Sequence, residues 1–384
     1  MSFRFTKLFL LTCMWIGLCV FESEAQVVPG EETFGVQYSI VPVLGYNSDY
    51  GLFGGGLFQR IDYGLGVRPF KSRSSANFTI STKWNIISKI DHERMESFGR
   101  EIRSRIRFEG IRLLSNTYFG IGNDTEFTSS AFEDGRYYFE ERTLNLRYWG
   151  RKNFMVFGQN GKIDGQLLAT VSYSDPVSSG NETVFETTRP EGYAGGWVNK
   201  AGLGVIVDNR DNEFDPSVGY RFETNASLAG TLTGSSYSFS HLFTELRGYV
   251  SPIRNLVIAQ KLEFQHSKGD VPFWELPTIG NEFGLRGYAL NRFRGDSSLL
   301  HIIELRSWLF SILDNQIRFG SQVFMDTGRV FAGDDRLGDL TGNLKQTYGF
   351  GGAISILNPD FIFRGDIAFS EDLYRIYLSV GYLF

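Results

Sequence analysis

The sequence predicts an all-β protein, a transmembrane antiparallel β-barrel of sixteen strands. Segments of about ten residues alternate apolar and polar side chains and are separated by turn residues, as strands of a membrane barrel do. Beyond residue 25 there is no apolar run of the ~18 residues that a membrane-spanning helix needs. The chain is also rich in aromatic residues, with 35 Phe and 18 Tyr, which suits the aromatic girdles of such barrels.

The first 25 residues have the pattern of a secretory signal peptide. Arg4 and Lys7 precede an apolar run from Leu8 to Val20, and the small-x-small sequence Ser23-Glu24-Ala25 follows. The expected organisation is therefore a signal peptide over 1–25, a short periplasmic leader over 26–34 and an outer-membrane barrel over 35–384. Both cysteines lie in the signal peptide, so the exported chain would have no disulfide and no cysteine nucleophile.

The strands follow from residue parity, because successive side chains on a strand point to opposite faces. The pattern is clearest in the C-terminal half, where the last segment places Tyr374, Ile376, Leu378, Val380, Tyr382 and Phe384 on one face. Turn residues divide the chain into strands near 36–46, 51–62, 75–84, 88–97, 101–112, 137–149, 163–174, 199–209, 217–230, 237–250, 254–266, 299–310, 316–331, 346–357, 361–369 and 374–384. The fourth is the weakest, because the charged run 91–94 interrupts its alternation.

Alternation by itself also fits a soluble β-sandwich, whose apolar faces pack on each other. Two features favour the membrane. Aromatic pairs lie near strand ends, as in a girdle: Tyr237 with Phe239, Tyr348 with Phe350, and Tyr382 with Phe384. If both termini are periplasmic, the long connections 113–136, 175–198 and 267–298 all face outward, which requires an even number of strands.

Other classes of function have little support in the sequence. The net charge of −5 provides no basic surface for nucleic acid. The four histidines, at 92, 241, 266 and 301, lack the spacing of metal ligands, and none pairs with a nucleophile. We therefore expect no enzyme activity, no cofactor, no metal and no nucleic-acid partner.

Three motifs and the C-terminal Phe384 resemble one family. They are Asp208-Asn209-Arg210-Asp211 with Pro216 and Gly219, the sequence Gly284-Leu285-Arg286-Gly287-Tyr288, and Phe324-Met325-Asp326-Thr327-Gly328. In order and spacing they resemble the barrel-assembly and two-partner-translocation superfamily, the BamA/TamA-like bacterial surface antigen domain. The resemblance covers residues 35 to 384. Members that insert or secrete proteins carry periplasmic POTRA modules, and this sequence is similar to the short subgroup without them.

The resemblance implies that the sixth outer loop folds into the lumen and is locked there. Arg286, Gly287 and Tyr288 would form the loop-lock motif, with Glu304, Phe324 and Asp326 as its lumenal partners. Parity independently assigns those three partners to the polar face of their strands. Arginine suits the role because its planar fork binds carboxylates through two bonds. A solvated loop arginine is the simpler alternative.

The remaining motif residues lie at the periplasmic end. Parity directs Asp208 and Arg210 inward, Asp211 follows, and Pro216 with Gly219 is expected to make a tight turn. An ordinary charged turn is an adequate alternative. The resemblance makes Phe384 the terminal aromatic that the barrel assembly machinery recognises, although it could also be one more girdle residue. It also implies a seam between the first and last strands that opens laterally.

Two functions follow as expectations. The first is a non-enzymatic protein of the outer membrane of a Gram-negative-type envelope that moves or inserts polypeptide or lipid, in contact with outer-membrane lipid. The second is a passive diffusion channel or receptor for small solutes. The Arg286 motif favours the first, since a general porin does not need a buried lock.

Overall fold

A computed structural model describes residues 35–64, 70–98, 102–314, 316–333, 340–356 and 362–384. The expected signal peptide and leader, residues 1–34, lie outside this part of the chain. The strands are β1 Gly35–Asn47, β2 Gly51–Tyr63, β3 Ser72–Ser81, β4 Ile86–Arg94, β5 Ile102–Thr117, β6 Tyr138–Phe157, β7 Gly161–Ser178, β8 Gly196–Asp208, β9 Gly219–Ala229, β10 Phe239–Ile253, β11 Leu256–Gly269, β12 Thr278–Ile279, β13 Phe293–Arg294, β14 Ser297–Ile312, β15 Ile317–Phe331, β16 Lys345–Ile356, β17 Ile362–Phe369 and β18 Tyr374–Val380.

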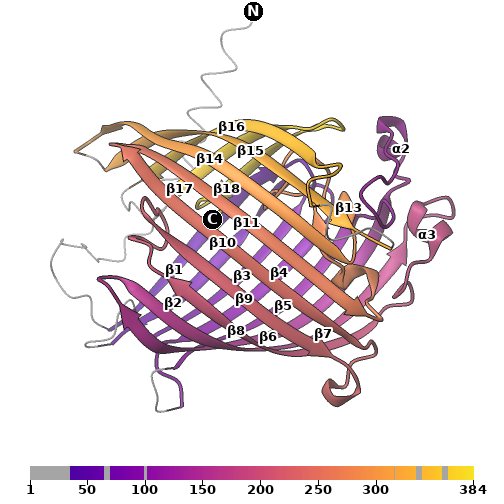
Figure 1. Cartoon of the computed structure of the whole chain (residues 1–384), viewed down its shortest axis with the longest axis horizontal. Coiled ribbons are helices and arrows are strands. Elements are labelled where there is room, and N and C mark those ends of the chain that lie inside the picture. Colours follow the sequence, from indigo (N-terminus) through magenta and orange to yellow (C-terminus); the bar gives the residue numbers. More distant parts are fainter. Residues whose placement is uncertain (1–34, 65–69, 99–101, 315, 334–339, 357–361) are drawn as a thin grey trace, which may run out of the picture.

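Sixteen of these strands form one closed antiparallel barrel, which confirms the predicted fold class and strand number. Each strand pairs with its neighbours in the chain, and β18 pairs with β1. The strands run obliquely around the barrel, and the short helices α2 (Ser129–Glu133) and α3 (Val184–Thr188) lie at one end (Figure 1). None of the helices in the described ranges is long and apolar enough to span a bilayer.

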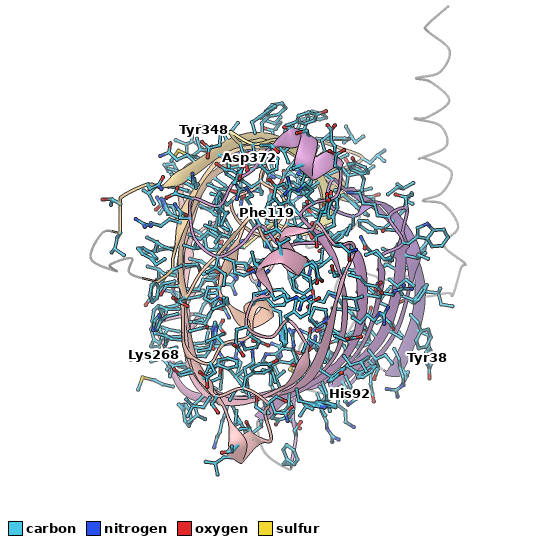
Figure 2. The ribbon with its side chains drawn as sticks, turned by 90° about the vertical axis from the view of Figure 1, so that its right-hand side faces the viewer. Tyr38, His92, Phe119, Lys268, Tyr348 and Asp372 are labelled. Carbon is cyan, nitrogen blue, oxygen red and sulfur yellow. The ribbon has the colours of Figure 1, made fainter. Side chains whose placement is uncertain are left out.

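Strand alternation separates an apolar outer face from a polar inner face. On β15, Val323 is half exposed, whereas its neighbours Gln322 and Phe324 are buried. A view along the barrel shows Tyr38 and Tyr348 pointing outward from the ring of strands, with Phe119 inside it (Figure 2). The girdle assignment therefore fits Tyr348 and Phe350, which are both exposed by more than half.

The weak fourth strand exists as β4, and its charges are explained by pairing. Asp91 accepts bonds from Arg105 and Arg107 of β5 at 2.6 and 3.0 Å. Glu93 lies 2.5 Å from Arg103 and is buried, while the intervening His92 is exposed. The alternation thus continues through the charged run, because the inward carboxylates are neutralised by the next strand.

The connection between β11 and β14 contains structure that the sequence pattern did not predict. We call residues 270–296 the β11–β14 loop. It holds a short 3-10 helix, η2 (Phe273–Glu275), and the two-residue strands β12 and β13, which pair with each other. Nine residues between β12 and β13 are buried. Leu285 and Tyr288 among them form an apolar cluster with Phe293 of β13 and with Leu300, Ile302 and Val330 of the barrel strands.

Two aromatic assignments are wrong. Phe239 is only 5% exposed and packs with Val198, Ala229 and Val271 instead of facing lipid, and the Tyr237 hydroxyl donates to the carbonyl of Gly195. Phe239 has the inward parity of Glu245 and Tyr249 on β10, and residues of the β11–β14 loop such as Val271 cover it. The second wrong assignment is that of Phe384 at the C-terminus to the aromatic girdle.

The last strand ends at Val380 and not at residue 384. Gly381 has φ +83°, a left-handed conformation that turns the chain out of the strand. Phe384 is consequently 5% exposed, packs in the cluster with Tyr249, and receives a hydrogen bond from Arg306 Nη2 to its carbonyl at 3.2 Å. The predicted placement of Phe384 on the lipid face is therefore wrong.

Candidate functional site

Arg286 is the largest fully buried side chain of the described residues, with no exposed surface. Its Nε and Nη2 donate to the two carboxylate oxygens of Asp326 at 2.9 and 2.7 Å, and its backbone N–H donates to Asp326 Oδ2 at 2.9 Å. This is the bidentate geometry in which a guanidinium binds a carboxylate most strongly. One loop residue is thereby fixed to β15 through both side chain and backbone.

Two further carboxylates complete the surroundings of the Arg286 guanidinium. Nη1 lies 2.7 Å from Glu304 of β14 and 3.4 Å from Asp366 of β17. Glu304 also pairs with Arg306 at 2.7 Å, and Asp366 pairs with Arg364 at 3.2 Å. We call these six residues the Arg286 cluster. Its three arginines and three carboxylates balance in formal charge, as buried ions require.

Phe324 supports the guanidinium from one side. The centre of its ring lies 3.4 Å from the Arg286 Cζ, which places the cation over the aromatic face. On β16, Gly349 is the cross-strand partner of Phe324, and a Cβ at Gly349 would lie 2.1 Å from the Phe324 ring. The glycine therefore leaves the space that the ring occupies.

The neighbours of Arg286 in the loop are held just as closely. Gly287 has φ +98°, and a Cβ there would lie 3.0 Å from the carbonyl carbon of Phe369. Its N–H donates to the Tyr377 hydroxyl at 3.2 Å, and its carbonyl accepts from Ser370 Oγ at 3.0 Å. Tyr288 is 1% exposed and packs edge-to-face on Phe293. The loop-lock motif thus contacts four strands, β14, β15, β17 and β18.

The structure brings Arg286 together with Glu304, Phe324 and Asp326. Asp366, Arg306, Arg364 and Tyr377 belong to the same site and were missed. Arg364 and Asp366 have the parity of the polar face of β17, opposite Phe363 and Ile367. Parity does not give the depth along the barrel at which each strand places its polar residue. That depth depends on the register between the strands.

The motif predicted to be periplasmic lies apart from the Arg286 cluster, in the connection between β8 and β9. Arg210 makes two bonds to Asp208, at 2.9 and 2.7 Å, and one Asp211 oxygen accepts the backbone N–H groups of Asn212, Ser217 and Val218. Gly219 has φ +112° as the next strand begins. The predicted tight turn at Pro216 and Gly219 is wrong. Residues 209–211 continue to pair with 218–220, so the connection is a wider loop organised by aspartate and asparagine side chains.

Asp215 in this loop reaches the wall formed by β14 and β15. Its Oδ2 accepts a bond from Trp308 Nε1 at 3.1 Å and lies 3.4 Å from Arg318 Nη2. Burial raises the pKa of the Asp215 carboxyl above its usual value, against the effects of Trp308 and Arg318. The loop between β8 and β9 thus reaches strands that β10 and β11 separate from β9 in the sheet.

A family model for the Omp85 superfamily domain matches residues 68–384, which include the β14, β15 and β17 positions of the Arg286 cluster and the periplasmic motif. The chain belongs to the Omp85 superfamily. It is accordingly an outer-membrane protein of a Gram-negative-type envelope, as the sequence predicted. The resemblance stated from the motifs is confirmed.

Solved Omp85 structures share the fold at low sequence identity. A structure of BamA from Haemophilus ducreyi lacking POTRA domains 1–3 is 14% identical, with a TM-score of 0.59 over 90% of this chain and 70% of that chain. CdiB from Escherichia coli is 10% identical, with a TM-score of 0.61 over 90% of this chain and 67% of that chain. Among curated proteins, none matches the sequence significantly.

Proposed function

We propose that this Omp85 barrel moves or inserts polypeptide or lipid at the outer membrane without enzymatic chemistry, with the β11–β14 loop held in the lumen by the Arg286 cluster. The observation that carries the proposal is the complete burial of Arg286 among Glu304, Asp326 and Asp366. A buried ion network is a poor source of net stability and a good means of fixing one arrangement of two elements. A barrel that only admits solutes has no need of it.

The closure between β1 and β18 supports lateral access to the bilayer. In the described residues the paired register between them is Asn47 with Tyr377, whereas β14 and β15 pair from Ser297–Phe331 to Ile312–Ile317. The free length of β1 is largely exposed, as at Tyr38, Ile40 and Leu44. Unpaired backbone at a sheet edge is a template for another strand or a route for a lipid-attached group.

The relatives indicate the kind of cargo. BamA and CdiB are assembly and translocation factors, so a polypeptide is the first cargo to test and lipid the second. Expected partners are outer-membrane lipid and, during biogenesis, the barrel assembly machinery. In that step Phe384 would be the recognised terminal residue while the chain is still unfolded.

Conductance tests this function against a diffusion channel or receptor. The half-exposed arginines on the inner face of β5 and β6, such as Arg105 and Arg147, favour a hydrated lumen and so give the channel alternative its support. In planar bilayers the intact protein should conduct poorly, and deleting residues 273–295 should raise its conductance. A large, steady conductance of the intact protein that the deletion leaves unchanged would support the channel.

Site-specific crosslinking tests for cargo. A photoreactive residue at Leu378, exposed on β18, should capture polypeptide or lipid in intact envelopes. The same residue at Leu203, equally lipid-facing but on β8, serves as the matched control. Equal capture of bulk lipid alone at both positions would argue against cargo transfer at the seam.

A further inference from the structure

A cavity of about 260 Å³ lies between the β11–β14 loop and the barrel strands β1, β5 and β6. Its wall combines residues of β1, the turn after β1, β5 and β6 with loop residues 281–283, 290 and 291. It is separate from the Arg286 cluster, none of whose six residues lines it. Nothing in the proposed transport function uses it.

Three carboxylates from different parts of the chain line this cavity. They are Asp49 in the turn after β1, Glu141 on β6 and Glu282 in the loop, and no lysine or arginine is among the lining residues. Within the described ranges, neither Glu141 nor Glu282 has a cation within ion-pair distance. Glu282 accepts a bond from Asn47 Nδ2 at 3.0 Å, and Glu141 accepts from Thr143 Oγ1 at 3.2 Å and from Asn116 Nδ2. The lining therefore carries three formal negative charges and no positive one, while Arg375 and Lys83 lie outside it and close to Asp49.

Asp49 provides independent evidence that the cavity lacks a hydrogen-bond donor. It is 6% exposed, and its Oδ1 accepts the Leu290 N–H at 3.1 Å, with Arg375 Nη2 at 3.5 Å. Its Oδ2 is buried and has no hydrogen-bond partner among the described residues. A buried carboxylate oxygen left without a donor is costly, so a donor is expected there.

The rest of the wall indicates the chemistry of that donor. Leu113, Phe283 and Leu290 give the cavity apolar surface next to its carboxylates. In the described part of the chain no group of three or more acidic, histidine or cysteine residues is arranged to hold a metal ion. Carboxylates spread around partly apolar walls suit a ligand that carries its charges on a hydrocarbon stem.

We propose that this cavity binds a small organic cation, a short aliphatic diamine whose ammonium groups pair with Asp49, Glu141 and Glu282. The volume is slightly below the roughly 300 Å³ at which drug-sized ligand pockets begin, and it fits a molecule with few heavy atoms. Burial raises the pKa of both Asp49 and Glu282 in the empty cavity, the cost that a bound cation would offset. Because loop and barrel wall both contribute ligands, the diamine would also stabilise the seated loop.

Calorimetric titration of the purified full-length chain with 1,4-diaminobutane tests the site. We expect saturable one-site binding, and Glu282→Gln should weaken it about tenfold or more, since charge-assisted bonds are lost. Glu141→Gln, on β6 of the barrel wall, should weaken diamine binding in the same way. Glu133→Gln, exposed on α2, is the matched control and should bind as the unaltered protein does. Heat-dependent gel mobility verifies that every variant is a folded barrel.

Two probes and a second readout make the outcome decisive. Butane-1,4-diol has the same length without charge and should not bind, and Mg²⁺ should not compete with the diamine. The diamine should slow proteolysis of the β11–β14 loop in the unaltered protein and not in Glu282→Gln. The proposal is overturned by a folded protein that does not bind the diamine, by equal affinity in Glu282→Gln, by binding of the diol, or by Mg²⁺ binding with the same dependence on Glu282. None of these results bears on conductance, so they leave the proposed transport function to its own test.

Discussion

The barrel uses arginine–carboxylate pairs in two regions of its inner face, and the two differ in burial. In the Arg286 cluster the guanidinium is fully buried and joins a loop to three strands. The second region, which we call the β4–β6 ladder, consists of Arg103, Arg105, Arg107 and Arg147 with Asp91, Glu93 and Glu109. Its arginines remain 22 to 40% exposed and connect only neighbouring strands.

The difference shows what burial adds to the same chemistry. Removing one partner of a buried pair leaves a charge that water cannot reach, at a cost of about 3 to 5 kcal/mol, whereas a solvated pair contributes about 0 to 1 kcal/mol. The strands of the ladder are already joined by backbone hydrogen bonds, so its ion pairs add little. The loop has no such ladder of backbone bonds to β15, so its attachment to that strand depends on Arg286.

The largest effect is expected from Arg286→Ala, which removes the cation that Asp326, Glu304 and Asp366 share. The loop should become sensitive to protease between residues 270 and 296, and the barrel should lose its resistance to SDS at a lower temperature. Arg286→Lys should restore the loop only in part, because an ammonium cannot make the bidentate contact with Asp326.

Arg107→Ala on the ladder is the matched control for this substitution. It removes the same side chain from Asp91, which keeps a second partner in Arg105. If both alanine variants show the same loop proteolysis as the unaltered protein, the Arg286 cluster does not hold the loop.

A double-mutant cycle is the second test of the contrast. Arg286→Ala and Asp326→Asn should be strongly non-additive, with a coupling free energy well above the ~1 kcal/mol of surface pairs, because they share one desolvated contact. The cycle of Arg107→Ala with Asp91→Asn should be additive to within about 0.5 kcal/mol. Equal coupling in the two cycles, measured by urea unfolding in lipid vesicles, would remove the distinction between the regions.

The two regions also differ in how well the sequence predicted them. Alternation gave sixteen strands because lipid on one side and polar contacts on the other impose the same parity on every strand. It identified Glu304 and Asp326 as inward but missed the contact of Arg286 with Asp366 on β17, because alternation does not give the depth at which each strand carries its polar residue. The charged run in β4 interrupts the apolar–polar alternation of that strand. The arginines that neutralise its carboxylates lie on β5, so the sequence of β4 alone could not explain the charges.

The two errors at strand ends have different physical causes. Phe384 carries the parity of lipid-facing residues, but Gly381 turns the chain out of the strand before it. Phe239 shares the inward parity of Glu245 and Tyr249 on β10, and loop residues such as Val271 cover it. Periodicity describes only the regular part of a strand, so it cannot predict which aromatic residue becomes covered at its end.

A third and smaller effect is expected from Gly287→Ala, which changes the lock without changing any charge. The added methyl group would meet the backbone of Phe369 and Ser370 at 3.0 to 3.1 Å in a left-handed conformation. A cost of about 1 to 3 kcal/mol is typical of such strain. Loop proteolysis should increase less than in Arg286→Ala, and the increase should not vary with salt. Gly333→Ala is the control, since its φ is +60° but a Cβ there would meet nothing within 4 Å.

The smallest effect is expected at the ladder itself, and its dependence on salt is what distinguishes it. Arg107→Ala should lower the free energy of unfolding by no more than about 1 kcal/mol, since Arg107 is 22% exposed and Asp91 retains Arg105. The loss should shrink as the salt concentration is raised from about 0.05 M to about 0.5 M, because mobile ions in the lumen screen solvated pairs. The loss caused by Arg286→Ala should stay nearly constant over the same range, because ions do not enter a site with no exposed surface. Equal salt dependence of the two variants would mean that water reaches Arg286, and the loop would then be a solvated segment and not a seated plug.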